Sequence, residues 1–542
     1  MKVHDVVAGG LADHGVTTLF GVMGEANMWV IDALVREHRV SYVPSFREDA
    51  AVLAADAWGR VTGRVGVASV THGPGLANAV TALVEAAKFG SPMVVVAGDT
   101  GREDVHNLQN FDQATVAELT GAGFQDLRSP QTALDDVAIA FRRAVLERRP
   151  IVLNLPVDIQ ESDVGRVEAT TVMAASYARS SRADEQQLDA AVGVLATARR
   201  PVVLAGRGAV QAGAREELLA LAERLGAPVA TSLLAKGWFH DQPHNLGVFG
   251  TFSTDLAGEI IAEADCVVAF GASLNDFTAA HGPLLDGKRL VQVDVDAARI
   301  GHWRPVSAGV VGDAKVVAST FCAWLDEIDH QPAGFASSEL ASRLARRNPA
   351  DDFEDHSGDE TIDMRTATIA LNGLLPKERT LVCDGGRFVM APIQYFDITD
   401  PRRFVWPVNF GSIGLGMGAA IGAATANPDT TTILALGDGG GMMNLLDLRT
   451  AVSRQFDLIV VVYNDGSYGA EYHNFAMVDA DPTLSLIDAP SFVAVAEGLG
   501  AEGVTVRNPD ELEHVQKLLA ERSGPIVIEL KLDPSKRIGF YD

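Results

Sequence analysis

Basic residues are scarce in this sequence. Its 44 lysine and arginine residues stand against 71 aspartate and glutamate residues, which gives a formal net charge of −27 at pH 7. A chain with this balance repels polyanions, so nucleic acid and anionic membrane surfaces are excluded as its main partners. Small molecules that carry phosphate are not excluded, because backbone N–H groups and a metal ion can hold them without lysine or arginine.

Cysteine and long apolar runs are also scarce. Only Cys266, Cys322 and Cys383 occur, and their spacing is not that of metal ligands, which predicts reduced core residues in a cytoplasmic protein. No segment approaches the roughly 18 uninterrupted apolar residues of a membrane span. The opening residues, MKVHDVVAGGLADHG, include acidic and polar residues where a signal peptide needs a continuous apolar region, so we expect no signal peptide.

Short β-branched segments alternate with alanine-rich helical segments along the whole chain. Examples are VGVASV, PMVVVAG, CVVAFGA, TTILALGDG and LIVVVYND. Strands that are apolar on both faces and separated by helices form parallel sheets covered on both sides. The chain is too long for a single core, and a prior of ~150 residues per domain suggests three or four domains. The sequence therefore predicts an α/β protein of doubly wound parallel-sheet domains.

Two stretches without core periodicity divide the chain. One runs from 162 to 186 and the other from 330 to 360, and both are rich in small and polar residues. They predict three domains, at 1–165, 185–330 and 360–542.

A glycine-rich loop follows one of the later strands. In ILALGDGGGMMNLLD, Asp438 stands among four glycines, and 24 residues separate its GDG from the pair Asn464 and Asp465 at the end of the next strand. A right-handed crossover brings these strand ends together. Oxygen ligands from two strand ends suit Mg²⁺, and bare glycine N–H groups at a helix start suit a phosphate. The pattern predicts a metal–diphosphate anchor; the alternative is a tight strand–helix turn in which Asp438 caps the helix.

The joint pattern of GDG, ND and YG resembles the thiamine diphosphate motif of the superfamily that contains pyruvate decarboxylase, pyruvate oxidase and acetolactate synthase. The resemblance extends over nearly the whole chain. The family's N-terminal loop is matched by FGVMGEAN (20–27), with Met23 where proline is usual. Its catalytic-glutamate segment and Gly-Pro-Gly loop resemble SFREDAAVLAADAWGRVTGRVGVASVTHGPGLANAVTAL (45–83), and the loop before the motif resembles NFGSIGLGMGAAIGAA (409–424).

This resemblance implies a role for each part of the chain. Residues 1–165 would form the pyrimidine-binding domain, 185–330 a central domain with a nucleotide-binding fold, and 360–542 the diphosphate-binding domain. The family builds each active site between the first domain of one subunit and the third domain of another. The resemblance therefore implies a homodimer or a homotetramer.

The resemblance also implies cofactor-binding residues. Glu48 matches the glutamate that hydrogen-bonds the aminopyrimidine ring and thereby activates the thiazolium carbon. Ile413 matches the bulky residue that wedges the cofactor into a bent conformation. Without the resemblance, Glu48 is a solvated carboxylate near a helix start and Ile413 is a core residue. Further positions in the matching loops are Gly386, Arg387, Ser412, Gly439, Gly440 and Tyr468.

The metal ligands follow from the same match. Asp438 is one ligand, and alignment on YG makes Asp465 the second, with the Ser467 carbonyl beside it. Asparagine is usual at the second position, so Asp465 is a departure that adds a negative charge near the diphosphate. Asn464 is the alternative ligand.

The residues above the reactive carbon decide which reaction follows. Glu25 matches a catalytic aspartate of the pyruvate decarboxylase branch, and Glu471 lies three residues after Tyr468, where that branch also has a glutamate. His72, in THGPG, and His473, in EYHNF, are proton donors suited to neutral pH. The alternatives are that His72 only braces its loop and that His473 lies on the surface.

Other segments resemble the acetolactate synthase branch. The segment LQNFDQ keeps Gln109 of that branch's FQExD sequence. The central domain of the branch, where FAD binds in some members, is matched by LLAKGWFHDQPHNLGVFG and VQVDVDAARIG. Two departures argue against FAD here: Leu274 stands where flavin-binding relatives commonly carry arginine, and Phe388 where many carry histidine.

These features predict an enzyme that uses thiamine diphosphate and Mg²⁺ to cleave a C–C bond next to a carbonyl. Decarboxylation of a 2-oxo acid is the first expectation, with carboligation of the acyl fragment as a companion activity. An acyl-transferring carboligase similar to acetolactate synthase is the close alternative. A non-catalytic nucleotide-binding paralogue is a third, against which Glu48, Ile413 and Asp438 speak.

Overall fold

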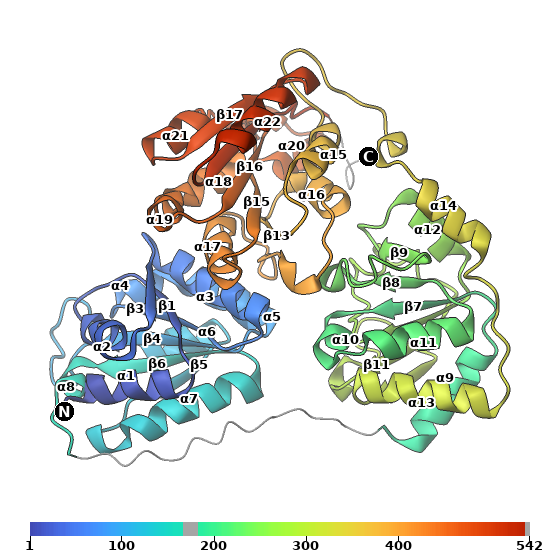
Figure 1. The fold of residues 1–542 in the computed structure, drawn as a ribbon. Helices are drawn as coiled ribbons and strands as arrows, with labels where there is room; N and C mark the ends of the chain where they lie inside the picture. The colour runs from blue at the N-terminus through green and yellow to red at the C-terminus, as the bar shows by residue number, and fades with distance from the viewer. Residues whose placement is uncertain (166–182, 537–542) are drawn as a thin grey trace. The chain divides into compact units, whose positions relative to one another are not determined.

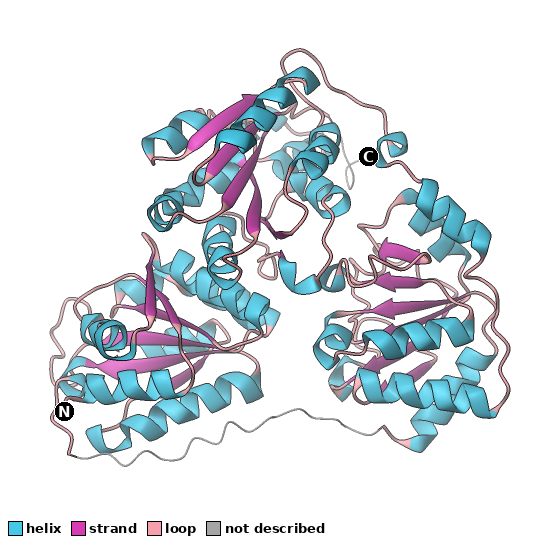
Figure 2. Ribbon diagram, viewed as in Figure 1, coloured by secondary structure: helices cyan, strands magenta, loops and turns pink. Residues whose placement is uncertain are grey.

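The computed structural model describes residues 1–165 and 183–536. The chain folds into two compact units. The first contains the N-terminal residues, Asp355–Pro392 and the residues from Val405 onward, and the second contains the central residues up to Glu354 together with Ile393–Phe404. Three six-stranded sheets with helices on their faces make up these units, which confirms the predicted α/β class (Figures 1 and 2).

The first sheet is formed by the N-terminal residues. Its strands pair in parallel in the order β2-β1-β3-β4-β6-β5. They are β1 (Thr18–Gly21), β2 (Ser41–Pro44), β3 (Gly66–Val70), β4 (Met93–Asp99), β5 (Gly123–Asp126) and β6 (Pro150–Pro156). The helices are α1 (Val3–Asp13), α2 (Met28–His38), α3 (Glu48–Thr62), α4 (Pro74–Asn78), α5 (Val80–Phe89), α6 (Gln113–Leu119), α7 (Ala133–Glu147) and α8 (Val157–Gln160). Apolar side chains of α1, α2 and α7 cover one face, and those of α3 and α5 cover the other.

The second sheet belongs to the central unit and has the order β12-β11-β10-β7-β8-β9. Its strands are β7 (Pro201–Ala205), β8 (Val229–Thr231), β9 (Asn245–Val248), β10 (Cys266–Phe270), β11 (Arg289–Asp294) and β12 (Ala308–Val311). The helices are α9 (Glu185–Ala196), α10 (Arg207–Ala212), α11 (Arg215–Leu225), α12 (Asp255–Glu263), α13 (Ala314–Glu327) and α14 (Ser338–Arg346). The helices α9, α11 and α13 pack on one face, and α12 and α14 on the other.

The helix α14 lies where a linker was expected, at 330–360. Ser337 caps it by accepting a hydrogen bond from the Leu340 N–H at 3.2 Å, and Leu340 is buried in the core of the central unit. Leu344, one turn later, packs on the same core. Two leucines four residues apart give too little periodicity to be recognised in sequence, but they suffice once a tertiary surface receives them. Most of the other expected linker, 162–186, lies outside the described residues.

The third sheet has the order β14-β13-β15-β16-β18-β17. Its strands are β13 (Arg379–Cys383), β14 (Phe404–Val405), β15 (Thr431–Gly437), β16 (Leu458–Asn464), β17 (Glu502–Val506) and β18 (Ile526–Lys531). The helices are α15 (Met364–Leu374), α16 (Met390–Tyr395), α17 (Gly416–Ala426), α18 (Asp438–Asn444), α19 (Leu448–Arg454), α20 (Gly469–Met477), α21 (Phe492–Gly498) and α22 (Leu512–Glu521). Side chains of α17, α19 and α21 cover one face of this sheet.

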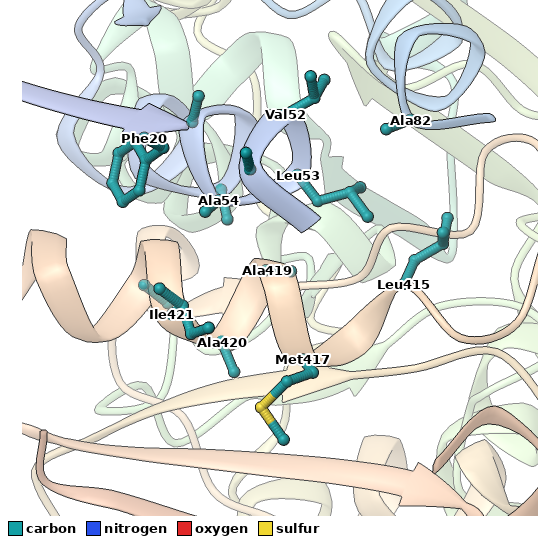
Figure 3. Close-up of a cluster of buried hydrophobic side chains, with 14 of the residues drawn as sticks. Phe20, Val52, Leu53, Ala54, Ala82, Leu415, Met417, Ala419, Ala420 and Ile421 are labelled. Atoms are coloured by element: carbon teal, nitrogen blue, oxygen red, sulfur yellow. The ribbon is translucent and has the colours of Figure 1, made fainter. Parts of the chain in front are cut away.

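The first and third sheets share one apolar core through α3 and α17. Figure 3 shows the two helices side by side, with Ala54 of α3 and Ala419 of α17 between them. The close approach of the two helices needs glycine. A Cβ atom on Gly422 would lie 2.0 Å from the Ala54 carbonyl oxygen, and one on Gly418 would lie 2.7 Å from that of Ala50.

The strand orders also define where ligands are expected. In the third sheet the order reverses between β13 and β15, and in the first sheet between β1 and β3. In doubly wound sheets, ligands bind beyond the carboxyl ends of the strands at such a reversal. The loop after β15 begins at Asp438, so the predicted metal–diphosphate anchor lies at a reversal point.

The three cysteines lie where the composition predicts them. Cys266, Cys322 and Cys383 are buried, which confirms that they are core residues. Between residues 1 and 165 and between 183 and 536, no helix is both long and apolar enough to cross a membrane.

Candidate active site

Asp438 ends β15 and opens α18, and it is buried. Its Oδ1 accepts a hydrogen bond from the Gly439 N–H at 2.8 Å. Its Oδ2 is also buried and has no hydrogen-bond partner among the described residues. Burial, with a further contribution from the nearby Asp465 carboxylate, raises the pKa of Asp438 to about 7. A buried oxygen without a partner next to a second carboxylate is an arrangement that a cation would stabilise.

The neighbouring strand end, after β16, carries the other predicted ligands. The Asn464 amide donates to Glu529 Oε1 on β18 at 2.7 Å, and its oxygen accepts from the Gly466 N–H at 3.1 Å. The Asp465 Oδ1 accepts from the backbone N–H and the hydroxyl of Ser467 at 3.0 and 2.7 Å. Asn464 is therefore engaged with β18, whereas the carboxylate of Asp465 acts on Asp438. This geometry favours Asp465 over Asn464 as a ligand.

The glycines around Asp438 are enclosed by residues of the neighbouring loops after β13 and β16. A Cβ atom on Gly440 would lie 2.3 Å from Asp384 Oδ2, and one on Gly439 would lie 2.9 Å from the Tyr468 ring. Side chains at these positions would clash. The local packing alone thus requires glycine at both positions.

Asp384, at the end of β13, is a site residue that the sequence patterns did not reveal. Its Oδ2 accepts from the Gly414 N–H at 2.8 Å, and its Oδ1 accepts from the N–H groups of Gly385 and Leu415 at 2.8 and 3.1 Å. Burial raises its pKa to about 6, and these N–H donors oppose the rise. Asp384 thereby anchors the loop that carries Ile413. One sequence signal could have revealed Asp384: like Asp438, it follows an apolar strand and precedes glycines.

Ile413 is partly exposed rather than buried in the core. Its Cδ1 lies 3.8 Å from the position of a Cβ on Gly439, and its Cγ2 lies 3.2 Å from that of a Cβ on Gly385. The side chain therefore lies between the loops after β13 and β15. Ser412, the preceding predicted residue, donates its hydroxyl to the Ile413 carbonyl at 3.1 Å.

Arg387 follows Gly386, whose φ of 138° favours glycine. The guanidinium donates to the Lys536 carbonyl at 2.6 Å and to His473 Nε2, and its Nη2 lies 3.6 Å from Asp465 Oδ2. His473 is buried, so it is not a surface residue. The contact between His473 and the guanidinium directs the Nε2 of this histidine toward Arg387. Glu471, on the same helix α20, is exposed.

Glu48 is the first residue of α3 and is half-buried. Its Oε2 accepts a hydrogen bond from the Asn78 amide at 3.0 Å. Asn78 ends the short helix α4, which begins at the proline of the Gly-Pro-Gly sequence. The carboxylate is thus held at the carboxyl-end side of the first sheet, between the loop after β2 and the loop after β3.

Glu25 and His72 are brought together at the strand ends β1 and β3. His72 is buried, and its Nδ1 lies 2.9 Å from the Thr71 hydroxyl. Burial lowers the pKa of His72, while the carboxylates of Glu25 and Asp99 act in the opposite direction. Glu25 is exposed.

Gln109 and Gln113 lie beside the Gly-Pro-Gly loop. The Gln109 carbonyl oxygen lies 2.3 Å from the position of a Cβ on Gly73, whose φ is +54°. The buried Gln113 accepts from the Gly73 N–H at 3.1 Å and donates to Asn154 Oδ1 at 2.6 Å. Gln113 had not been singled out, although it lies in the quoted segment LQNFDQ, because a glutamine carries no pattern of its own.

The donor set at the two strand ends fits a hard divalent cation. The described residues contain no cluster of three or more His, Cys, Asp or Glu side chains that could hold a metal. Two carboxylates and a backbone carbonyl are nevertheless sufficient for Mg²⁺, which keeps water and phosphate oxygens in its remaining positions. Asp438, Asp465 and the Ser467 carbonyl fit that pattern, and the unpartnered Oδ2 of Asp438 supports it.

Comparison with known proteins defines the class. The model of the N-terminal thiamine pyrophosphate binding domain matches residues 1–119, that of the central domain matches 188–321, and that of the C-terminal thiamine pyrophosphate binding domain matches 384–530. The chain belongs to the thiamine diphosphate-dependent enzyme family.

Individual relatives cover almost the whole chain. It is 28% identical to a probable acetolactate synthase large subunit of Methanocaldococcus jannaschii, over 99% of this chain and 93% of that protein. It is 30% identical to a sulfoacetaldehyde acetyltransferase of Alcaligenes xylosoxydans, over 93% of this chain and 87% of that protein. It is 27% identical to the acetolactate synthase large subunit of Buchnera aphidicola, over 98% of this chain and 95% of that protein.

Proposed function

We propose that the protein is a thiamine diphosphate- and Mg²⁺-dependent enzyme that cleaves the C–C bond next to the carbonyl of a 2-oxo acid and transfers the acyl fragment to an acceptor. The observation that carries this proposal is the pair of buried carboxylates, Asp438 and Asp465, at the ends of β15 and β16. The unpartnered Asp438 oxygen is a site for a cation between the protein and a diphosphate.

Each residue near these strand ends has a proposed role. Asp438, Asp465 and the Ser467 carbonyl would hold Mg²⁺. When bound, thiamine diphosphate would supply a nucleophilic carbon and, in its ring, an electron sink for the cleaved bond. Glu48 would hold a proton at the aminopyrimidine ring, and Ile413 would fix the bend of the cofactor. The remaining proposed cofactor contacts are Gly386, Arg387, Ser412, Gly439, Gly440 and Tyr468.

Acyl transfer is supported by the names of the relatives. Acetolactate synthase and sulfoacetaldehyde acetyltransferase are both named for transfer or joining of an acyl group. Glu25, His72, Gln109 and Glu471 are the proposed residues that orient the acceptor or move protons around it, and His473 is proposed to act through Arg387.

Simple decarboxylation is a second candidate, and the pairing of Glu25 with His72 favours it. A carboxylate beside a buried histidine can deliver a proton to the acyl fragment, which would release an aldehyde instead of transferring the acyl group.

We also propose an arrangement in space. The parts 1–165 and 360–542 would supply the pyrimidine and diphosphate sites, and 185–330 would form a central domain without FAD. Apolar side chains near the proposed site are exposed, among them Met23, Phe46 and Phe410. Their exposure supports a homodimer or homotetramer in which partner subunits cover them.

The test uses pyruvate and the Glu48→Gln variant. The wild-type protein with Mg²⁺ and thiamine diphosphate is expected to consume pyruvate, and mass spectrometry should detect acetolactate. Glu48→Gln should lose most turnover while still binding the cofactor, because only the proton held at the pyrimidine changes. Acetaldehyde and CO₂ without acetolactate would select the decarboxylase for this substrate. A Glu48→Gln variant with full turnover would contradict both candidates.

A further inference from the structure

The site places three acidic side chains, Asp438, Asp465 and Asp384, in a largely buried region. The Asp465 side chain is 9% exposed and acts on the buried Asp438 carboxylate. Asp384 lies next to Gly440, where a Cβ atom would be 2.3 Å from its Oδ2. An anionic ligand brought to this place meets like charges in a region of low dielectric, where repulsion is strong.

Arg387 is the cation that faces this cluster. Its side chain is only 2% exposed, and its Nη2 lies 3.6 Å from Asp465 Oδ2. A guanidinium keeps its charge at any pH at which the protein is folded. It therefore offsets the charge of Asp465 permanently.

The remaining contacts of Arg387 fix its direction. One nitrogen, Nη1, donates to the Lys536 carbonyl at 2.6 Å, to the Pro534 carbonyl at 3.5 Å and to His473 Nε2. Two of these groups are backbone carbonyls of the segment after β18, and the third is on helix α20. They hold the guanidinium in place beside Asp465, with which it forms an ion pair.

We propose that Arg387 is a positioning residue that neutralises Asp465, so that Asp465 can serve a divalent cation without repelling the diphosphate bound to that cation. This inference rests on the proposed metal–diphosphate site and adds a role that its ligands do not explain. Without Arg387, the charge of Asp465 would act undiminished on the metal. The same negative charge, next to the diphosphate, would no longer be offset.

The test separates metal binding from anion binding. The probes are Mn²⁺ alone, followed by electron paramagnetic resonance, and inorganic pyrophosphate in the presence of Mg²⁺, followed by calorimetry. Arg387→Gln is expected to bind Mn²⁺ as well as or better than the wild type, because Asp465 is then not neutralised. It should bind pyrophosphate about 10- to 100-fold more weakly, the order expected when one positive charge is removed from the neighbourhood of an anion in a partly buried site. Arg387→Lys should retain most of the pyrophosphate affinity.

A double substitution distinguishes charge from packing. In an Asp465→Asn background the charge to be offset is gone, so adding Arg387→Gln should cost less than about threefold in pyrophosphate affinity, the coupling expected of a direct pair. An equal loss in both backgrounds would overturn the proposal, because Arg387 would then act through packing alone. Unchanged affinities in Arg387→Gln would overturn it as well.

Controls keep the outcome decisive. Arg289 pairs with Asp265 at 2.8 Å in the central unit, and Arg289→Gln should leave both affinities unchanged. If Arg387→Gln fails to fold, recovery of folding in the double variant with Asp465→Asn supports the proposed charge balance. If the double variant also fails to fold, the proposal is overturned. Wild-type protein that binds no pyrophosphate with Mg²⁺ would instead refute the proposed site itself.

Discussion

Several acidic side chains are buried within residues 360–542, among them Asp384, Asp438 and Asp447. Burial raises the pKa of Asp384 and Asp447 to about 6 and is the main cause that raises the pKa of Asp438 to about 7. The folded protein therefore holds protons on these groups at a pH where the unfolded chain, with carboxyl pKa values near 4, has released them. Stability from these groups is present below about pH 4 and is lost as pH rises to about 7.

The Asp438→Asn variant tests this linkage. In metal-free protein the free energy of unfolding should fall between pH 5 and pH 8, and the fall should be smaller in Asp438→Asn, since each pKa unit is worth about 1.4 kcal/mol. Urea unfolding at the two pH values measures both slopes. Parallel slopes for the two proteins would show that Asp438 keeps an ordinary pKa in the folded state.

Sequence patterns identified some of these residues and missed others for a physical reason. Asp438 and Asp465 stand at a motif spacing, which is a property of two positions and can be read from the chain. Asp384 and Gln113 act through hydrogen bonds to backbone N–H groups distant in sequence, at Gly414 and Gly73. Such contacts leave no spacing signal, because they depend on which loops the fold brings together.

Among the elements, the pair α3 and α17 sets how the first and third sheets meet. Gly422→Ala places a methyl group against the Ala54 carbonyl, at 2.0 Å in the present geometry, so the helices must separate. We expect a loss of roughly 1–3 kcal/mol or more in the free energy of unfolding. Urea unfolding measures it.

Gly373 is the matched control for this substitution. It is an exposed glycine within helix α15, and a Cβ there meets nothing within 4 Å. Gly373→Ala should stabilise the protein by about 0.5–1 kcal/mol, since alanine is the better helix former. Equal effects of the two substitutions would contradict close packing of α3 on α17.

A second contact between elements holds the segment that leads to Glu48. Asp447 accepts from the Phe46 N–H at 2.8 Å, Thr450 donates to the Pro44 carbonyl at 2.9 Å, and Arg454 donates to the Tyr42 carbonyl. The three side chains come from one face of α19 and the turn before it. Their spacing of three and four residues is visible in sequence, but the backbone groups that they contact are not. For that reason the elements were predictable and their pairing was not.

In the whole molecule, three six-stranded α/β sheets are present among the described residues; the first and third share one strand order, and the central sheet has a different one. Alternation of apolar strands and helices predicted this class, because strands covered on both faces must be apolar throughout. The segment Ile393–Phe404, which belongs to the central unit although it follows β13, was not predictable. Its assignment depends on tertiary packing and has no local signal.

Subunit mixing tests the proposed arrangement of active sites between subunits. Glu48→Gln and Asp438→Ala should each be inactive alone. If the sites combine the first domain of one subunit with the third of another, mixed dimers contain one intact site, and an equal mixture should regain about a quarter of wild-type activity. Activity that stays at the level of the separate variants would show that each site lies within one chain.

Calorimetric titration of metal-stripped protein with thiamine diphosphate tests the central claim most directly. With Mg²⁺ present, the wild type is expected to bind about one cofactor per chain, and Asp438→Ala should bind it at least 10-fold more weakly because the cation loses a ligand. Without Mg²⁺, wild-type affinity should fall to a similar degree. Binding that is absent in the wild type, or that is the same with and without Mg²⁺ and Asp438, would contradict the metal–diphosphate site.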